Sequence, residues 1–69
     1  DAAILEFDPI AFEVYRDQGD EFRWRLRHSN GQIIADSGEA YASRSNAVEA
    51  AKRVRSHAPA AETIELEQA

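Results

Sequence analysis

Apolar and charged residues alternate strictly over residues 22–27, which read Phe-Arg-Trp-Arg-Leu-Arg. Successive side chains of a strand point to opposite faces, so this pattern predicts a strand with one apolar face and one charged face. Asn30-Gly31 follows and favours a two-residue type I′ turn, because both residues tolerate positive φ. A second short strand resumes after Asn30-Gly31 and completes the predicted hairpin.

The two-residue turn fixes the register of this hairpin, which pairs Arg25 with Asp36 and Arg27 with Ile34. It also pairs Leu26 with Ala35 and Trp24 with Ser37. The resulting apolar face, which we expect to form the core, carries Phe22, Trp24, Leu26, His28, Ile33 and Ala35.

Residues 12–16 also alternate and predict a first strand, followed by a turn over residues 17–21 in which Gly19 is free to adopt positive φ. Pairing the two strands across this turn sets Val14 opposite Trp24 on the core face. The same register sets Glu13 beside Arg25. A row of charges, Glu13–Arg25–Asp36, is therefore predicted to cross the outer face of the sheet.

A helix is predicted from an N-cap at Ser43, with Ser45 as the alternative cap, to about His57. Pro59 is expected to move Ala58 out of helical geometry and so end the helix. The apolar stripe of the helix comprises Ala47, Val48, Ala51, Val54 and Ala58.

Residues 63–67 predict a last short strand with Ile64 and Leu66 pointing inward. The order is then β-β-β-α-β, an α+β fold with an antiparallel meander and one helix on one face. Residues 1–10 are interpreted as a leading segment, either an extra strand or a disordered lead, and residues 11–69 as a single domain. Because the chain opens at Asp1 without methionine, we expect it to be processed or cut from something longer.

The 69-residue chain contains no cysteine and two histidines, so the sequence offers neither a disulfide nor a convincing zinc site. Ordering each residue costs roughly 1.5 kcal/mol, which apolar burial in so short a chain offsets only narrowly. Association with a second copy is the remaining source of burial. We therefore expect a homodimer, with no cofactor and no metal.

The net charge of −5 and pI of about 4.8 argue against bulk attraction to nucleic acid or an anionic membrane. No apolar run approaches the roughly 20 residues of a membrane span, so a soluble cytoplasmic protein is expected. Lysine supplies one of the eight basic residues. That bias is compatible with a high-salt cytoplasm or with genome composition.

Four stretches together resemble the YegP-like family of small domains without an assigned function. They are residues 12–17 (Phe-Glu-Val-Tyr-Arg-Asp), residues 22–26 (Phe-Arg-Trp-Arg-Leu), residues 30–39, which contain Ala-Asp-Ser-Gly-Glu, and residues 41–43 (Tyr-Ala-Ser). The resemblance covers about residues 11–66. It implies a β3-α-β unit that occurs twice, as tandem repeats or as a homodimer, with one continuous sheet and exchanged C-terminal strands. The sequence departs from the family at Ala40, where glycine is frequent, and in its alanine-rich helix. No catalytic residues are implied.

The outer arginines are the most suggestive feature for a partner, since Arg23 and Arg27 near Tyr15 are able to contact phosphates or stack on bases. The alternative, which we favour, is a solvated face with ordinary cross-strand charge pairs. In that interpretation Arg25 is neutralised by Glu13 and Asp36, and Arg23 and Arg27 remain uncompensated.

A second candidate is an anion site at the predicted helix start, formed by Ser43, Arg44 and Ser45. A capped helix explains these residues equally well and is the preferred interpretation. We assign structural roles to His28 and His57, because neither has a partner at catalytic spacing, and a core role to Trp24.

The sequence thus predicts a non-enzymatic, homodimeric interaction or structural module without a known small-molecule ligand. The dimer strand is expected to contain Thr63, Ile64, Glu65 and Leu66. Weak binding of nucleic acid or another anionic polymer through Arg23 and Arg27 is the leading alternative. An enzyme with a site at the dimer cleft is the third, without positive support.

Overall fold

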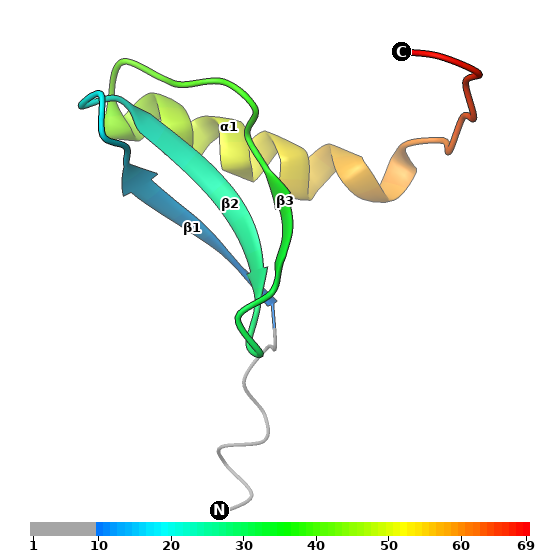
Figure 1. Cartoon of the computed structure of the whole chain (residues 1–69), viewed down its shortest axis with the longest axis horizontal. Coiled ribbons are helices and arrows are strands. Elements are labelled where there is room, and N and C mark those ends of the chain that lie inside the picture. Colours follow the sequence, from blue (N-terminus) through cyan, green and yellow to red (C-terminus); the bar gives the residue numbers. More distant parts are fainter. Residues whose placement is uncertain (1–9) are drawn as a thin grey trace, which may run out of the picture.

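The computed structural model describes residues 10–69, in which a three-stranded antiparallel sheet packs against one helix (Figure 1). The sheet has the order β1-β2-β3. Its strands are β1 (Ile10–Arg16), β2 (Phe22–His28) and β3 (Ile33–Asp36), and they are followed by α1 (Arg44–His57) and the short 3₁₀ helix η2 (Ala58–Ala60). The predicted α+β meander with one helix is confirmed as far as α1.

The β1–β2 pairing follows the predicted register, with Glu13 opposite Arg25 and Val14 opposite Trp24. β1 starts at Ile10 rather than at residue 12, because the seven-residue β2 extends the ladder until Ile10 pairs with His28. The remainder of the predicted leading segment lies outside the described residues.

The turn between β1 and β2 is organised by Asp17. Its carboxylate oxygen Oδ1 accepts hydrogen bonds from the backbone N–H groups of Gly19 and Glu21, at 2.8 and 3.0 Å. Gly19 does not use its freedom to adopt positive φ, because Asp20 takes that role with φ 64°. Aspartate tolerates the left-handed region better than most non-glycine residues.

The β2–β3 turn differs from the expected type I′ turn. The N–H of Gly31 donates to the carbonyl of His28 at 2.8 Å, and the N–H of His28 donates to the carbonyl of Gln32 at 2.8 Å. Gly31 has φ 94°, whereas Asn30 is not among the positive-φ residues. The loop is therefore a three-residue connection closed by a left-handed glycine, which spares Asn30 a strained backbone.

The register of β3 is as predicted at Leu26–Ala35 and Arg25–Asp36 but shifts by one residue beyond Leu26. Arg27 pairs with Ile33, so the predicted Arg27–Ile34 pair is wrong and Ile34 is the extra residue of a bulge. The bulge compensates for the longer turn, which keeps the rest of the ladder in register.

The residues after β3 return to the sheet. Tyr41 forms a bridge with Phe22, in which each backbone N–H donates to the other's carbonyl at 2.7 and 2.8 Å. The chain then enters α1 through Ser43, whose Oγ accepts from the N–H of Asn46 at 3.1 Å, so the predicted N-cap is confirmed.

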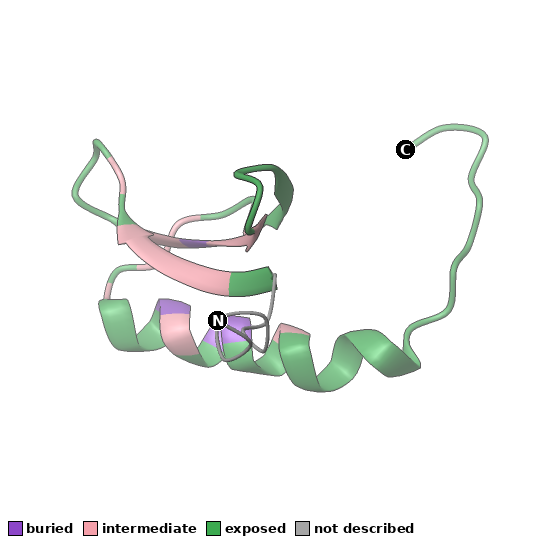
Figure 2. Cartoon of the chain, turned by 90° about the horizontal axis from the view of Figure 1, so that it is seen from below, coloured by how far each residue is buried: buried purple, intermediate pink, exposed green. Residues whose placement is uncertain are grey.

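The core lies between the middle of β2 and the first half of α1 (Figure 2). Trp24 is 7% exposed and packs on Ala50 and Ala51. Its ring meets that of Phe12 edge to face, with centroids 5.5 Å apart. Alanines permit close approach of the helix to the sheet, and Ala47 is fully buried. The core role predicted for Trp24 is confirmed.

The core is smaller than the predicted apolar face. Ile33, which is 50% exposed, and Ala35 belong to the predicted apolar face but are both exposed, since α1 covers the centre of the sheet and not β3. Within the helix stripe, Ala58 is exposed and the sequence had missed Ala50.

Helix α1 ends at His57 as expected, but Ala58 keeps helical dihedral angles of −57° and −38°. The predicted departure at Ala58 is thus wrong, because Pro59 occupies the first turn of η2, where no backbone N–H is required. The backbone becomes extended at Ala61. None of the helices in residues 10–69 is long and apolar enough to cross a bilayer.

Candidate functional site

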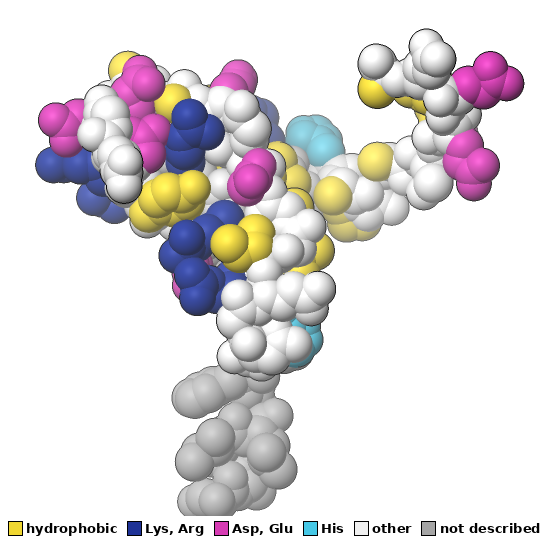
Figure 3. Space-filling view, in the orientation of Figure 1, with side chains coloured by type: hydrophobic (Ala, Val, Ile, Leu, Met, Phe, Trp, Pro, Cys, Tyr) yellow, Lys and Arg dark blue, Asp and Glu magenta, His cyan; other side chains and the backbone are white. Residues whose placement is uncertain are grey.

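The outer face of the sheet carries a network of arginines and carboxylates (Figure 3). Glu13 Oε1 accepts a hydrogen bond from Arg25 Nε at 2.7 Å, and Arg27 Nε lies 3.2 Å from the same oxygen. Arg25 Cζ also lies 4.7 Å from the centroid of the Tyr15 ring. The hydrogen bond from Arg25 is the main reason why the pKa of Glu13 is below its ordinary value, and Arg27 lowers this pKa further.

Arg23 belongs to the same face and contacts Asp17, with Nε 2.8 Å from Oδ2. This hydrogen bond lowers the pKa of Asp17, which the backbone N–H groups of Glu21 and Gly19 lower further, and it raises the pKa of Arg23. The prediction that Arg23 and Arg27 are uncompensated is therefore wrong, because each contacts a carboxylate. The acidic turn residue at position 17 was the sequence signal for the Arg23 pair.

The three residues of the predicted charge row lie opposite one another in the sheet, but only Glu13 and Arg25 form an ion pair. Glu13, Arg25 and Asp36 are cross-strand neighbours. Among the residues that the structure describes, however, Asp36 makes no ion pair, and its Oδ1 instead accepts from the N–H of Gly38 at 3.1 Å. Gly38 has φ 71°, so this hydrogen bond supports the turn after β3.

The residues of the predicted anion site at the helix start lie close together, and their side chains contact other groups of the protein. Ser43 Oγ caps the helix and lies 3.2 Å from Ser45 Oγ. Arg44 turns toward the sheet, where its Cζ lies 4.9 Å from the centroid of the Phe22 ring. Arg16, at the end of β1, places its Cζ 5.4 Å from the same centroid. No local sequence pattern predicts that Arg16 and Arg44 converge on Phe22.

A groove of about 140 Å³ lies between β1 and α1. Its walls are mostly apolar, and two basic residues of the helix lie along it. The lining residues are Phe12, Val14, Val48, Ala51, Lys52 and Arg55. The groove follows β1, which is an edge strand of the described sheet.

The segment after η2 extends away from the rest of the molecule (Figures 1 and 2). Ile64 and Leu66 are each 71% exposed, the highest exposure of any large apolar residue described. Thr63 and Glu65 are exposed as well. The predicted fourth strand is not formed within the single chain, since nothing in residues 10–69 pairs with it.

The two histidines lie far apart in the fold, His28 at the end of β2 and His57 at the end of α1. His28 Nδ1 is 3.3 Å from the N–H of Asn30, within the hairpin turn. Residues 10–69 contain no cluster of three or more His, Cys, Asp or Glu side chains placed to hold a metal ion.

Several known proteins are similar to this chain over most of its length. A protein called UPF0339 protein from Treponema denticola is 42% identical over 55 residues, covering 80% of this chain and 93% of that protein. One from Methanosarcina acetivorans is 46% identical over 56 residues, covering 81% and 95%. A relative from Stutzerimonas stutzeri is 42% identical over 48 residues, which are 70% of this chain but 42% of that protein.

A solved structure agrees with the fold. The NMR solution structure of a protein from Haloferax volcanii superposes with a TM-score of 0.80 at 47% sequence identity, covering 87% of this chain and 100% of that chain. The family model described as domain of unknown function DUF1508 matches residues 17–65. With this match and these relatives, the chain belongs to the DUF1508 family, whose function is uncharacterised.

Proposed function

We propose that this chain is a non-enzymatic homodimeric module in which residues 63–66 of each copy complete the sheet of the other. The observation that carries the proposal is the 71% exposure of both Ile64 and Leu66 on an extended segment with alternating apolar and polar residues. Water contact at two large aliphatic side chains is unfavourable, and full burial stabilises each by about 1.5–3 kcal/mol.

The edge at β1 is the better acceptor for this segment. An added strand next to β1 hydrogen-bonds to an open edge and places its apolar side chains over the groove beside α1. A reciprocal exchange gives a two-fold symmetric interface, in which both copies use the same surface.

Two further observations support a paired unit. The matched segment is less than half of the Stutzerimonas stutzeri relative, which is therefore long enough to contain two such units. The resemblance to the YegP-like family implies the same arrangement, as tandem units or as a dimer.

The test is the molar mass of the intact chain by light scattering at micromolar concentration. We expect a dimer for the parent chain and a monomer for the double variant Ile64→Asp/Leu66→Asp. Glu65→Gln is the matched control, since it changes the same segment without adding charge to its apolar side. A well-folded monomeric parent chain, or a double variant that remains dimeric, contradicts the proposal.

Binding of an anionic polymer through Arg23 and Arg27 has less support. Both guanidinium groups already contact carboxylates, at 2.8 and 3.2 Å, so a phosphate must compete with an existing partner.

A further inference from the structure

Two arginines meet at one aromatic ring where β1 ends and α1 begins. Arg16 pairs with Phe22 in the β1–β2 ladder, and Tyr41 bonds the backbone of Phe22 in the bridge that follows β3. This bridge brings residue 44 back to the sheet. Three separate segments therefore deliver Arg16 and Arg44 to the Phe22 ring, at the opposite end of α1 from the C-terminal segment (Figure 1).

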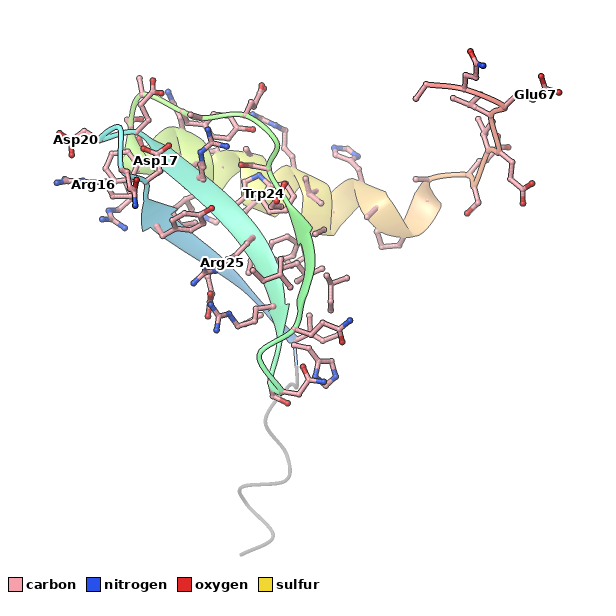
Figure 4. All side chains as sticks on the ribbon, in the orientation of Figure 1. Arg16, Asp17, Asp20, Trp24, Arg25 and Glu67 are labelled. Atoms are coloured by element: carbon pink, nitrogen blue, oxygen red, sulfur yellow. The ribbon has the colours of Figure 1, made fainter. Side chains whose placement is uncertain are left out.

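The charges of these two arginines are free, unlike those of the outer face. Arg23, Arg25 and Arg27 each lie within 3.2 Å of a carboxylate oxygen. Arg16 and Arg44 are exposed, and neither has a carboxylate within ion-pair distance in the part of the chain that is described. Asp17, the neighbour of Arg16, is already engaged by Arg23 and by its own turn (Figure 4).

The common ring limits the separation of the two guanidinium groups. Their Cζ atoms lie 5.4 and 4.9 Å from one centroid. The distance between the two Cζ atoms therefore cannot exceed the sum of these values, about 10 Å. Cation–π contact restrains both side chains before any ligand arrives, which reduces the entropy lost on binding. The helix N-terminus is not needed, because Ser43 already caps it.

We propose that Arg16 and Arg44, held by Phe22, form a binding site for linked phosphate groups, as in a diphosphate or a phosphodiester backbone. Guanidinium groups present planar forks that match phosphate oxygens in bidentate contacts. Two forks at most about 10 Å apart suit two connected phosphates, one at each arginine. The site differs from the outer face because its cations have no carboxylate to displace.

The test is a calorimetric titration of the intact chain with inorganic pyrophosphate at low salt. We expect saturable binding that weakens as salt rises, and a loss of at least tenfold in affinity for Arg16→Gln and for Arg44→Gln. Arg53→Gln is the matched control, since it removes one charge from an exposed part of α1 away from Phe22. Equal weakening by the control, or no binding by the parent chain, overturns the proposal.

The ring contact is tested separately with Phe22→Leu, which keeps the charge and an apolar side chain but removes the aromatic face. We expect weaker pyrophosphate binding with an unchanged circular dichroism spectrum, and unchanged affinity contradicts the role of the ring.

A parallel titration with a short single-stranded oligonucleotide identifies the source of the phosphates. Oligonucleotide binding that is lost in Arg44→Gln assigns them to a nucleic-acid backbone, and pyrophosphate binding alone assigns them to a free anion.

Discussion

The two faces of β2 are built by different forces, although their residues alternate along one strand. On the inner face, Trp24 is buried against the alanines of α1 and contacts the edge of the Phe12 ring. On the outer face, Arg25 remains partly exposed and is held by Glu13 and Tyr15. Burial of a large ring contributes several kcal/mol, whereas an exposed ion pair contributes about 1 kcal/mol or less.

The inner face of β2 therefore contributes most of the free energy of unfolding, and the outer face contributes a smaller part. Neighbouring substitutions in β2 should therefore differ several-fold in effect. Only the outer face should respond to pH and salt, because its contacts are charged and solvent-exposed.

The largest effect is expected for Trp24→Ala. The substitution removes the centre of a small core and should lower the free energy of unfolding by about 3–5 kcal/mol, enough to unfold many domains of this size. Thermal or denaturant unfolding followed by circular dichroism measures the change. Cooperative unfolding near the midpoint of the parent chain would show that the inner face does not carry the stability.

A smaller but clear effect is expected for Ala47→Leu. Ala47 is fully buried where α1 meets the sheet, so a larger side chain forces the two apart at a cost of about 1–3 kcal/mol. Ala60→Leu is the control, because Ala60 is exposed and should change stability by less than about 0.5 kcal/mol. Similar effects at both positions would contradict tight packing at residue 47.

Arg25→Ala tests the outer face directly. It removes the contacts with Glu13 and Tyr15, both partly exposed, so we expect a loss of about 1 kcal/mol or less. Arg53→Ala, an exposed arginine outside this network, provides the baseline in the same unfolding assay. A loss comparable to that of Trp24→Ala would remove the distinction between the two faces.

The smallest effect is expected from acidification. The pKa values of Glu13 and Asp17 are lowered in the folded state, mainly by hydrogen bonds from Arg25 and Arg23. Their stabilisation is therefore present above the pKa of an unfolded carboxyl group, near pH 4, and is lost as the pH falls through the folded values. The free energy of unfolding should therefore decline as the pH falls below about 4. Glu13→Gln should make that decline shallower, and an unchanged pH profile would contradict the role of Glu13.

Much of the fold was accessible from local patterns. Alternation identified β1 and β2, the hairpin signal at Asn30-Gly31 identified β3, Ser43 and Pro59 bracketed α1, and the β1–β2 register was correct at each predicted pair. The turn at Asn30-Gly31 was misjudged, because dipeptide preference does not reveal whether one or both residues take positive φ. Hairpin geometry, including the bulge at Ile34, settled that choice.

The candidate sites were less accessible to sequence reasoning. Arg23 and Arg27 lie on the outer face as alternation predicts, but their carboxylate partners come from a turn and from a neighbouring strand. Residues 63–66 were recognised as an apolar alternation, and the single chain leaves them unpaired.

The sequence by itself determined the three strands and α1, because strand alternation, turn signals and helix capping act over a few neighbouring residues, and strand register also predicted the Glu13–Arg25 pair. Tertiary structure decided the other charge contacts. Asp17 reaches Arg23 across a turn, and Tyr41 returns to Phe22 so that Arg16 and Arg44 share one ring. Such contacts depend on the relative positions of segments far apart in the chain, which only the packing of α1 and the paired strands sets.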